Sequence, residues 1–254
     1  MIICGDNVET LATFDADCID LTVTSPPYGE LRAYGGHSWD FEGLAQQLWR
    51  VTKPGGVVVW VVADQTIDGS ESGDSFRQAL RFKEIGFRLH DTMIYKKQCF
   101  IPLTHNRYEQ CWEYMFVFAN GRPSVWNPIM VKCDTFGTKQ LRAAAKQYEP
   151  GFAMRRRFER VEVNEQRQHE NLFVYSVGKN DKTAHNAPFP EALARDHIIS
   201  WSNPGDLVYD PFMGSGTTGK MARVSGRDYV GSETSREYCD IAEKRVSIYE
   251  IMEV

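Results

Sequence analysis

Two short stretches combine residue types that could do chemistry, and they lie far apart in the chain. The first is Thr24-Ser-Pro-Pro-Tyr28, in which two prolines remove backbone donors and restrict the dihedral angles of Ser25. The second is Asp210-Pro-Phe-Met-Gly-Ser-Gly-Thr-Thr218, a glycine-rich stretch followed by Gly219 and Lys220. One offers acceptors in a rigid turn, and the other a backbone that a ligand can approach closely.

The proline turn suits an exocyclic amine. Its carbonyl oxygens and the Ser25 hydroxyl can accept hydrogen bonds from an NH₂ group and direct the nitrogen lone pair at a methyl donor. Tyr28 adds a flat face on which a planar base could stack. Taken alone, the stretch fits an ordinary proline turn with a core tyrosine equally well.

The glycine-rich stretch has two interpretations. It nearly spells a phosphate-binding P-loop, but Met221 follows Lys220 where that loop needs Ser or Thr to hold magnesium. Asp210 would repel a triphosphate and attract a sulfonium and an amino group, as in S-adenosylmethionine. Glu233 ends the next predicted strand, where an acid can accept both ribose hydroxyls, although NAD would satisfy that rule too. The pattern favours S-adenosylmethionine over a nucleoside triphosphate.

Alternating strands and helices must position these stretches. Apolar runs predict strands near residues 1–6, 18–27 (ending at the double proline), 57–63, 92–97, 112–120, 206–212 and 228–233. Helical spacing predicts helices near residues 41–51, 190–201, 217–226 and 235–251, the second opening at Pro190. A strand, glycine turn, helix and strand form a βαβ unit of a parallel sheet. We therefore predict an α/β fold with a mixed, mostly parallel sheet and helices on both faces.

Composition limits the class of protein. With 254 residues and 42% hydrophobic content, the chain can bury one core, with at most one insertion. We expect an intracellular, non-membrane protein, because the start lacks a signal-like pattern and no apolar run is long enough to span a bilayer. The six cysteines show no CxxC pair or zinc-like spacing, so we expect reduced thiols and no metal.

The charge is distributed unevenly. The whole chain carries a formal charge of −5, yet basic side chains outnumber acidic ones between Lys132 and Lys182. This stretch includes Arg155, Arg156 and Arg157 and is poor in aliphatic residues. It fits either a solvated surface segment or a local face that contacts nucleic acid.

The two motifs together resemble those of the amino-methyltransferases of DNA, which methylate N4 of cytosine or N6 of adenine. Ser25-Pro-Pro-Tyr28 resembles their catalytic tetrapeptide, and Asp210 to Thr218 resembles their cofactor turn. Because the tetrapeptide comes first in the chain, the order is similar to that of the β group. The resemblance implies a circularly permuted, Rossmann-like fold that binds S-adenosylmethionine. Residues 1–121 would be its catalytic half, 122–182 an inserted target-recognition segment and 183–254 its cofactor-binding half.

The resemblance also implies roles for particular residues. Asp6 is similar to the acid near the cofactor adenine, Glu233 to the ribose-binding acid, and the segment from His185 to the one that covers the methionyl group. The implied catalytic residues are Ser25, Pro26, Pro27 and Tyr28. The implied cofactor-binding residues are Asp6, His185, Pro188, Asp210, Pro211, Phe212, Gly214, Gly216, Thr217, Thr218 and Glu233. The implied contacts to double-stranded DNA are Arg155, Arg156, Arg157, Lys96, Lys97 and Arg107, the last three from loops between strands.

Several alternatives stay open. Serine before the prolines is more frequent in cytosine-N4 enzymes of the family, so Ser25 favours cytosine over N6 of adenine. Other classes are a protein-glutamine methyltransferase, a P-loop nucleotide-binding module and a non-enzymatic binding module with a decayed site. The family resemblance further implies a bacterial or phage-encoded cytoplasmic enzyme, in which a homodimer is plausible.

Overall fold

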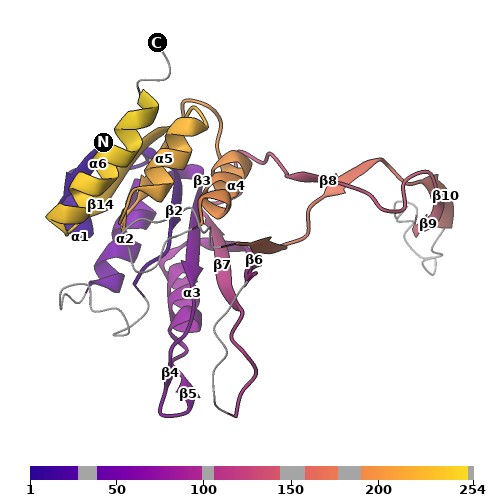
Figure 1. The fold of residues 1–254 in the computed structure, drawn as a ribbon, viewed down its shortest axis with the longest axis horizontal. Coiled ribbons are helices and arrows are strands. Elements are labelled where there is room, and N and C mark those ends of the chain that lie inside the picture. The colour runs from indigo at the N-terminus through magenta and orange to yellow at the C-terminus, as the bar shows by residue number, and fades with distance from the viewer. Residues whose placement is uncertain (28–38, 99–105, 144–157, 177–189, 251–254) are drawn as a thin grey trace, which may run out of the picture. The chain divides into compact units, whose positions relative to one another are not determined.

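The apolar runs of the sequence form a sheet flanked by helices (Figure 1). The computed structural model describes residues 1–27, 39–98, 106–143, 158–176 and 190–250. It divides the chain into two units, which are described separately below. The larger one comprises Met1–Asn127 with Asn171–Val254, and the smaller one comprises Pro128–Glu170.

The larger unit contains a sheet of eight strands in the order β1-β14-β13-β2-β3-β7-β6-β12. Only β7 runs opposite to its neighbours, and every other pairing in the sheet is parallel. The strands are β1 (Ile2–Cys4), β2 (Ile19–Thr24), β3 (Thr52–Val62), β6 (Arg88–Lys97), β7 (Trp112–Ala119), β12 (Leu172–Tyr175), β13 (Leu207–Asp210) and β14 (Asp228–Glu233). The predicted mixed, mostly parallel sheet is confirmed.

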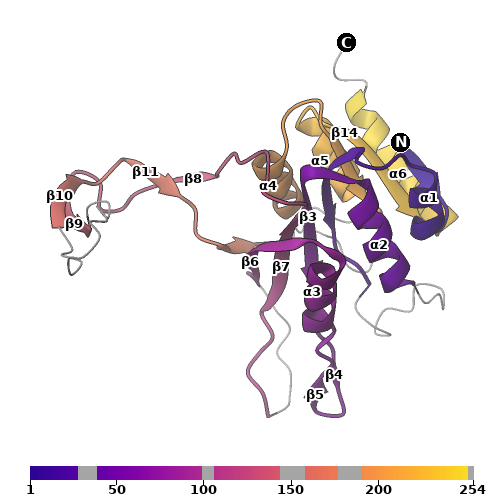
Figure 2. The same ribbon diagram turned by 180° about the vertical axis from the view of Figure 1, so that it is seen from behind.

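Helices cover both faces of this sheet, as Figures 1 and 2 show from opposite sides. One face carries α1 (Asn7–Ala12), α2 (Phe41–Val51) and α3 (Asp74–Ile85), and the other carries α4 (Glu191–Trp201), α5 (Thr217–Val224) and α6 (Arg236–Glu250). β3 is buried on both faces, as its continuous apolar run predicts. Val58, Trp60 and Val62 point to the side of α1–α3, where Trp60 and Phe82 pack edge to face.

The helix boundaries follow from local chemistry. Asp40 caps α2 by accepting a hydrogen bond from the Gly43 backbone N–H, and α4 begins directly after Pro190 as predicted. The sequence patterns did not reveal α1 and α3, nor the short hairpin of β4 (Thr66–Ile67) and β5 (Ser70–Glu71) between β3 and α3. α1 has only six residues, too few for a periodic signal. Within the described ranges, no helix is both long and apolar enough to cross a bilayer.

The smaller unit consists of two antiparallel strand pairs. β8 (Met130–Lys132) pairs with β11 (Gln166–Gln168), and β9 (Lys139–Ala143) pairs with β10 (Phe158–Glu162). The predicted insertion at 122–182 is longer than this unit. The difference arises because the Leu172–Tyr175 strand near its end hydrogen-bonds to β6 and so belongs to the large sheet.

Candidate active site

Two turns that are distant in sequence meet at one edge of the sheet. β2 and β13 are parallel neighbours, so the turn after Thr24 and the turn after Asp210 leave the sheet at the same edge. The Thr24 Oγ1 donates a hydrogen bond of 2.7 Å to Asp210 Oδ1 and joins the two strand ends directly. The prediction that the proline turn and the glycine-rich turn lie at neighbouring strand ends is confirmed.

The proline turn is held firmly at its start, and Ser25 and Pro27 beyond it are partly exposed. Thr24 is fully buried, Ser25 and Pro27 are half-buried, and Pro26 is buried. The Thr24 hydroxyl cannot swing away without breaking its bond to Asp210. Tyr28, the last member of the motif, lies outside the described residues. The turn thus begins at a fixed point, with the Ser25 side chain at the edge of the sheet.

The glycine-rich turn needs glycine for two different reasons. Gly214 and Gly216 adopt φ angles of +51° and +83°, which other residues rarely adopt. A Cβ on Gly216 would also lie 2.9 Å from Ala242 Cβ of α6. Gly216 therefore also allows α6 to pack closely against the turn. The backbone N–H of Gly214 donates a hydrogen bond to Glu233 Oε2 at 2.9 Å. Pro211 is buried, and the Phe212 ring contacts Trp39 and Trp60.

Glu233 links three parts of the site. Its Oε2 accepts from Gly214 N, its Oε1 accepts from Ser235 N at 2.8 Å, and its carbonyl oxygen accepts from Gly5 N at 2.9 Å. The carboxylate is half-buried, and each oxygen has a further acceptor site. An acid fixed in this way can accept hydrogen bonds from two neighbouring hydroxyl groups.

Asp6 and Asn7 complete this edge at the end of β1. Asp6 caps α1, since its Oδ1 accepts from the backbone N–H groups of Val8 and Glu9. Asn7 is buried, and its Nδ2 donates to the Pro211 carbonyl oxygen at 3.2 Å. The Asn7 Oδ1 is buried and accepts no hydrogen bond from the described residues. Sequence reasoning missed Asn7, because no periodic pattern marks a polar residue in so short a helix.

A salt-bridge cluster of Glu191, Lys220 and Arg245 contacts the glycine-rich turn and the start of α5. The Lys220 Nζ lies 2.5 Å from Glu191 Oε1, and Arg245 Nη2 contacts the same oxygen. Arg245 Nη1 also donates to the hydroxyls of Ser215 and Thr217, at 3.0 and 3.1 Å. Lys220, which made the sequence resemble a P-loop, is thus paired with an acid at the start of α4. Because Lys220 is already paired, the cluster argues against the binding of a triphosphate at this turn.

Glu191 should matter for stability through this cluster. Partial burial alone would raise the pKa of its carboxyl, but hydrogen bonds from Lys220 and Arg245 hold that pKa below its ordinary value. We expect Glu191→Gln to lower the free energy of unfolding by about 2 kcal/mol at pH 7, because two partly buried cations lose their counter-charge. Urea unfolding measures this.

The pH dependence of this stability difference tests whether the charge of Glu191 is its cause. A lowered folded-state pKa stabilises the protein above the ordinary glutamate value of about 4.3, and the gain is lost as the pH falls through the lower, folded-state value. The difference between wild type and Glu191→Gln should therefore shrink in acid. Glu237→Gln, at an exposed site in the first turn of α6, should change little. An equal loss in both variants would contradict the assigned role of Glu191.

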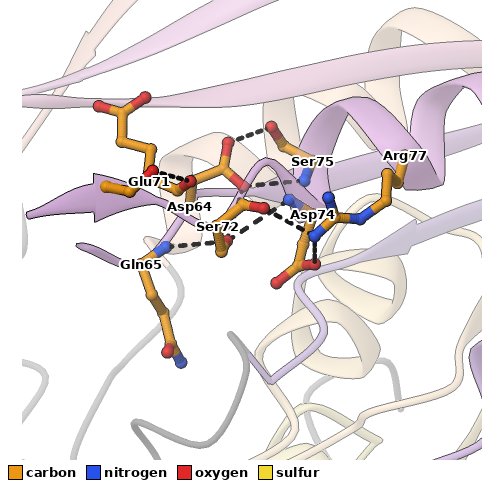
Figure 3. Close-up of polar contacts among 8 residues, drawn as sticks. Asp64, Gln65, Glu71, Ser72, Asp74, Ser75 and Arg77 are labelled. Carbon is orange, nitrogen blue, oxygen red and sulfur yellow. Dashed lines mark hydrogen bonds and ion pairs between the residues drawn. The ribbon is translucent and has the colours of Figure 1, made fainter. Parts of the chain in front are cut away.

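The short β4–β5 hairpin lies at the same edge, directly after β3, and Figure 3 shows the polar contacts between it and the start of α3. The Asp64 carboxylate accepts from Ser72 Oγ at 3.1 Å and Ser75 N at 3.0 Å, which fixes the hairpin to the start of α3. A cavity of about 270 Å³ has a lining that includes Asp64, Glu71, Arg107, Tyr108, Trp112 and Tyr114. The hairpin thus contributes Glu71 to the lining of this cavity.

The structure corrects the position of two predicted DNA contacts. Lys96 and Lys97 do not lie in a loop between strands, because both belong to β6, which pairs with β7 and β12 there. Lys97 Nζ is also paired with Glu113 at 2.6 Å, whereas Lys96 is exposed. Arg107 does lie between strands, but its guanidinium donates to the Gly69 carbonyl oxygen and faces Glu71. The remaining predicted site residues, His185, Pro188, Arg155, Arg156 and Arg157, lie outside the described residues.

The donor and acceptor groups of this edge fit a cationic nucleoside better than a phosphate. Asp6 and Glu233 supply acceptors at adjacent strand ends, and Lys220, the residue that resembles a P-loop lysine, is paired with Glu191. A triphosphate would meet carboxylates, whereas amino, ribose hydroxyl and sulfonium groups would meet acceptors. S-adenosylmethionine carries these groups.

Comparisons with known proteins agree with this site. The N6/N4 methyltransferase family model, described as DNA methylase, matches residues 19–244. The orphan methyltransferase M.BamHII of Bacillus amyloliquefaciens is 51% identical over 245 residues, covering 93% of this chain and 92% of that protein.

Solved structures share the fold. The cytosine-N4-specific PvuII DNA methyltransferase superposes with a TM-score of 0.68 at 21% identity, covering 98% of this chain and 90% of that one. The M1.HpyAVI–SAM complex superposes with a TM-score of 0.66 at 23% identity, covering 97% of this chain and 98% of that one. Because the family model spans most of the sequence and the Bacillus relative matches nearly all of it, the chain belongs to the N6/N4 DNA methylase family and is a DNA methyltransferase.

Proposed function

We propose that the enzyme transfers a methyl group from S-adenosylmethionine to the exocyclic amino group of a base in double-stranded DNA, with N4 of cytosine as the favoured target. The observation that carries this proposal is the meeting of the Ser25 turn and the glycine-rich turn at one sheet edge, joined by the 2.7 Å bond from Thr24 to Asp210. An amine held by the first turn and a methyl donor held by the second would share one site. N6 of adenine is the alternative target.

The cofactor would be held by the ends of three neighbouring strands, β1, β14 and β13. Glu233 would accept the ribose hydroxyls, Asp6 would lie near the adenine, and the turn around Gly214 would approach the methionyl part. The bound cofactor supplies an electrophilic methyl group on a sulfonium. The segment that includes His185 and Pro188 would cover it. Direct contacts from Asp210, Phe212, Thr217 and Thr218 stay predictions.

The proline turn would orient the acceptor amine. The Ser25 hydroxyl and the Pro26 carbonyl oxygen would accept hydrogen bonds from the NH₂ group, which disfavours delocalisation of its lone pair into the ring. The target base would have to leave the helical stack, since its amino group cannot otherwise reach the turn. Tyr28 would stack on the extruded base. The nitrogen would attack in line and lose its surplus proton afterwards, without a cysteine nucleophile.

The choice between cytosine and adenine rests on Ser25. Both bases present an aromatic amine beside a ring nitrogen, so the acceptors of this turn distinguish them poorly. Serine in front of the two prolines favours cytosine. The cytosine-N4 specificity of the PvuII enzyme belongs to a structure that is only 21% identical.

Nucleoside analysis tests the proposal directly. Purified enzyme is incubated with tritiated S-adenosylmethionine and either plasmid DNA or protein extract. The DNA is then digested to nucleosides, and the methylated nucleoside is identified by mass spectrometry. We expect label in DNA as N4-methylcytosine. N6-methyladenine would overturn the choice of base, label in protein alone would overturn the substrate class, and binding without any transfer would support a decayed site.

The smaller unit, within the 122–182 segment, would supply target recognition, and its basic residues would contact the DNA backbone. We expect replacement of Arg155, Arg156 and Arg157 by alanine to weaken duplex binding and to reduce the slope of log K against log salt by about one for each phosphate that is no longer neutralised. Fluorescence anisotropy at several salt concentrations measures both. Alanine at three exposed basic residues of the large unit, Lys83, Arg236 and Lys244, is the matched control. An unchanged salt slope would mean that the three arginines do not contact phosphates and are ordinary surface residues.

A further inference from the structure

Three elements of the active-site edge converge on one buried carboxylate. Asp210 Oδ1 accepts from Thr24 Oγ1 at 2.7 Å and from Phe212 N at 3.0 Å, and Asp210 Oδ2 accepts from Thr218 Oγ1 at 2.7 Å. The exposed fractions are 5% for Asp210, 0% for Thr24 and 1% for Thr218. The bonds therefore connect the end of β2, the glycine-rich turn and the first turn of α5, in the core of the protein.

The donor pattern favours an ionised carboxylate. Each threonine hydroxyl has a single proton, and an ionised Asp210 can accept from both hydroxyls and from the Phe212 N–H at the same time. Hydrogen bonds to a charged acceptor are stronger than neutral ones, and more so away from water. Thr218 Oγ1 also lies 3.3 Å from the Val23 carbonyl oxygen, an acceptor that would compete for its proton if Asp210 were neutral.

We propose that Asp210 is a positioning residue, and that its hydrogen bonds from Thr24 and Thr218 fix the place of the Ser25 turn relative to the cofactor turn. Thr24 directly precedes Ser25, so a displacement of Thr24 moves the acceptors that hold the amine. The proposal rests on the proposed function of these two turns. It gives Asp210 and Thr218 a role that requires no direct contact with the cofactor.

The ionisation of Asp210 follows from the same contacts. Its pKa is raised to about 6, mainly because the carboxyl is buried; the hydrogen bonds from Thr24, Thr218 and the Phe212 N–H oppose this rise, and the nearby charge of Glu233 adds to it. Above that pH the carboxylate accepts all three bonds. Below it the added proton turns one oxygen into a donor, so one of these bonds must reverse or weaken; Thr218, for example, could then donate to the Val23 carbonyl oxygen instead. Loss of the Thr24 donor should move this transition to higher pH.

The chain offers a matched control for Thr24. Thr22 lies two residues earlier on β2, is equally buried, and its Oγ1 has no partner among the described residues. Thr22→Val and Thr24→Val make the same change of shape on the same strand. Only the second removes a hydrogen bond to Asp210. Thr24→Ser restores the hydroxyl.

Kinetics and carboxyl-carbon NMR of Asp210 test the proposal together. We expect Thr24→Val to lower kcat at saturating substrates by roughly tenfold to a hundredfold with little change in the Kd for S-adenosylmethionine, and Thr24→Ser to recover most of the rate. The Asp210 pKa should rise in Thr24→Val and in Thr218→Val and stay unchanged in Thr22→Val. The acidic limb of the kcat profile should move with it.

The possible outcomes separate this inference from the proposed function. A wild-type rate in Thr24→Val, or an equal loss in Thr22→Val, overturns the positioning role while methylation by the wild type leaves the function intact. If the wild type methylates no DNA, the proposed function fails. In that case an Asp210 pKa that is insensitive to Thr24 also overturns the positioning role, whereas a shifted one supports the connection between the two turns.

Discussion

We expect the Ser25→Ala variant to lose roughly 10²-fold in kcat while its Kd for S-adenosylmethionine stays nearly unchanged. The change removes one acceptor of the amine, and a single positioned polar group in an active site typically contributes a factor of this size. Thr24 remains tied to Asp210, so the backbone of the turn keeps its place. Steady-state kinetics at saturating DNA and calorimetry with the cofactor measure the two quantities.

A serine at the opposite edge of the sheet provides the control. Ser124 donates through its hydroxyl to the Gly55 carbonyl oxygen at 3.2 Å, far from the strand ends that form the site. Ser124→Ala should therefore retain the wild-type rate. A parallel loss of rate and cofactor affinity in Ser25→Ala would mean that Ser25 supports the cofactor, and not the amine.

The fold was predictable because its largest elements carry strong patterns. The apolar run of β3 is long enough to be read as a doubly buried strand, and Pro190 marks a helix start. Other elements are stabilised by contacts that no local pattern records. β12 is a four-residue strand in a basic segment, and it exists because its backbone pairs with β6.

The site was predictable as a set of turns but less so as a set of contacts. The sequence placed Ser25, Asp210 and Glu233 at strand ends, and parallel strands bring such ends to one edge. It could not reveal that the Asp210 carboxylate points inward to Thr24 and Thr218. An inward carboxylate and a cofactor ligand look alike in sequence, because the difference is a matter of side-chain direction.

Pairing partners from distant segments explain the remaining differences. Lys220 follows a glycine loop in sequence, yet its partner Glu191 comes from another helix. Lys97 ends a strand and pairs with Glu113 of the next one, and Arg107 contacts the hairpin at Gly69. Several basic residues that could bind phosphate, judged from the sequence alone, are thus already paired with other groups of the protein. Lys96 stays exposed at the sheet edge and remains a candidate DNA contact.

Glu233 should contribute most to cofactor affinity. Glu233→Gln keeps the shape of the side chain but removes its charge and turns one acceptor into a donor that faces Gly214 N–H or Ser235 N–H. Hydrogen bonds to charged groups contribute about 1.5–3 kcal/mol, and 1.4 kcal/mol corresponds to a factor of ten in Kd. We therefore expect the Kd for S-adenosylmethionine, measured by calorimetry, to rise by roughly 10²-fold.

The demethylated product separates the ribose contact from the sulfonium charge. S-adenosylhomocysteine has the same ribose without the positive charge, so loss of ribose hydrogen bonds should weaken both ligands equally. A loss confined to S-adenosylmethionine would instead indicate that Glu233 acts through the charge of the sulfonium. Asp228→Asn, at an exposed position where the same strand begins, should leave both affinities unchanged. Unaltered binding in Glu233→Gln would show that Glu233 does not contact the cofactor and that its only role is to support the Gly214 turn.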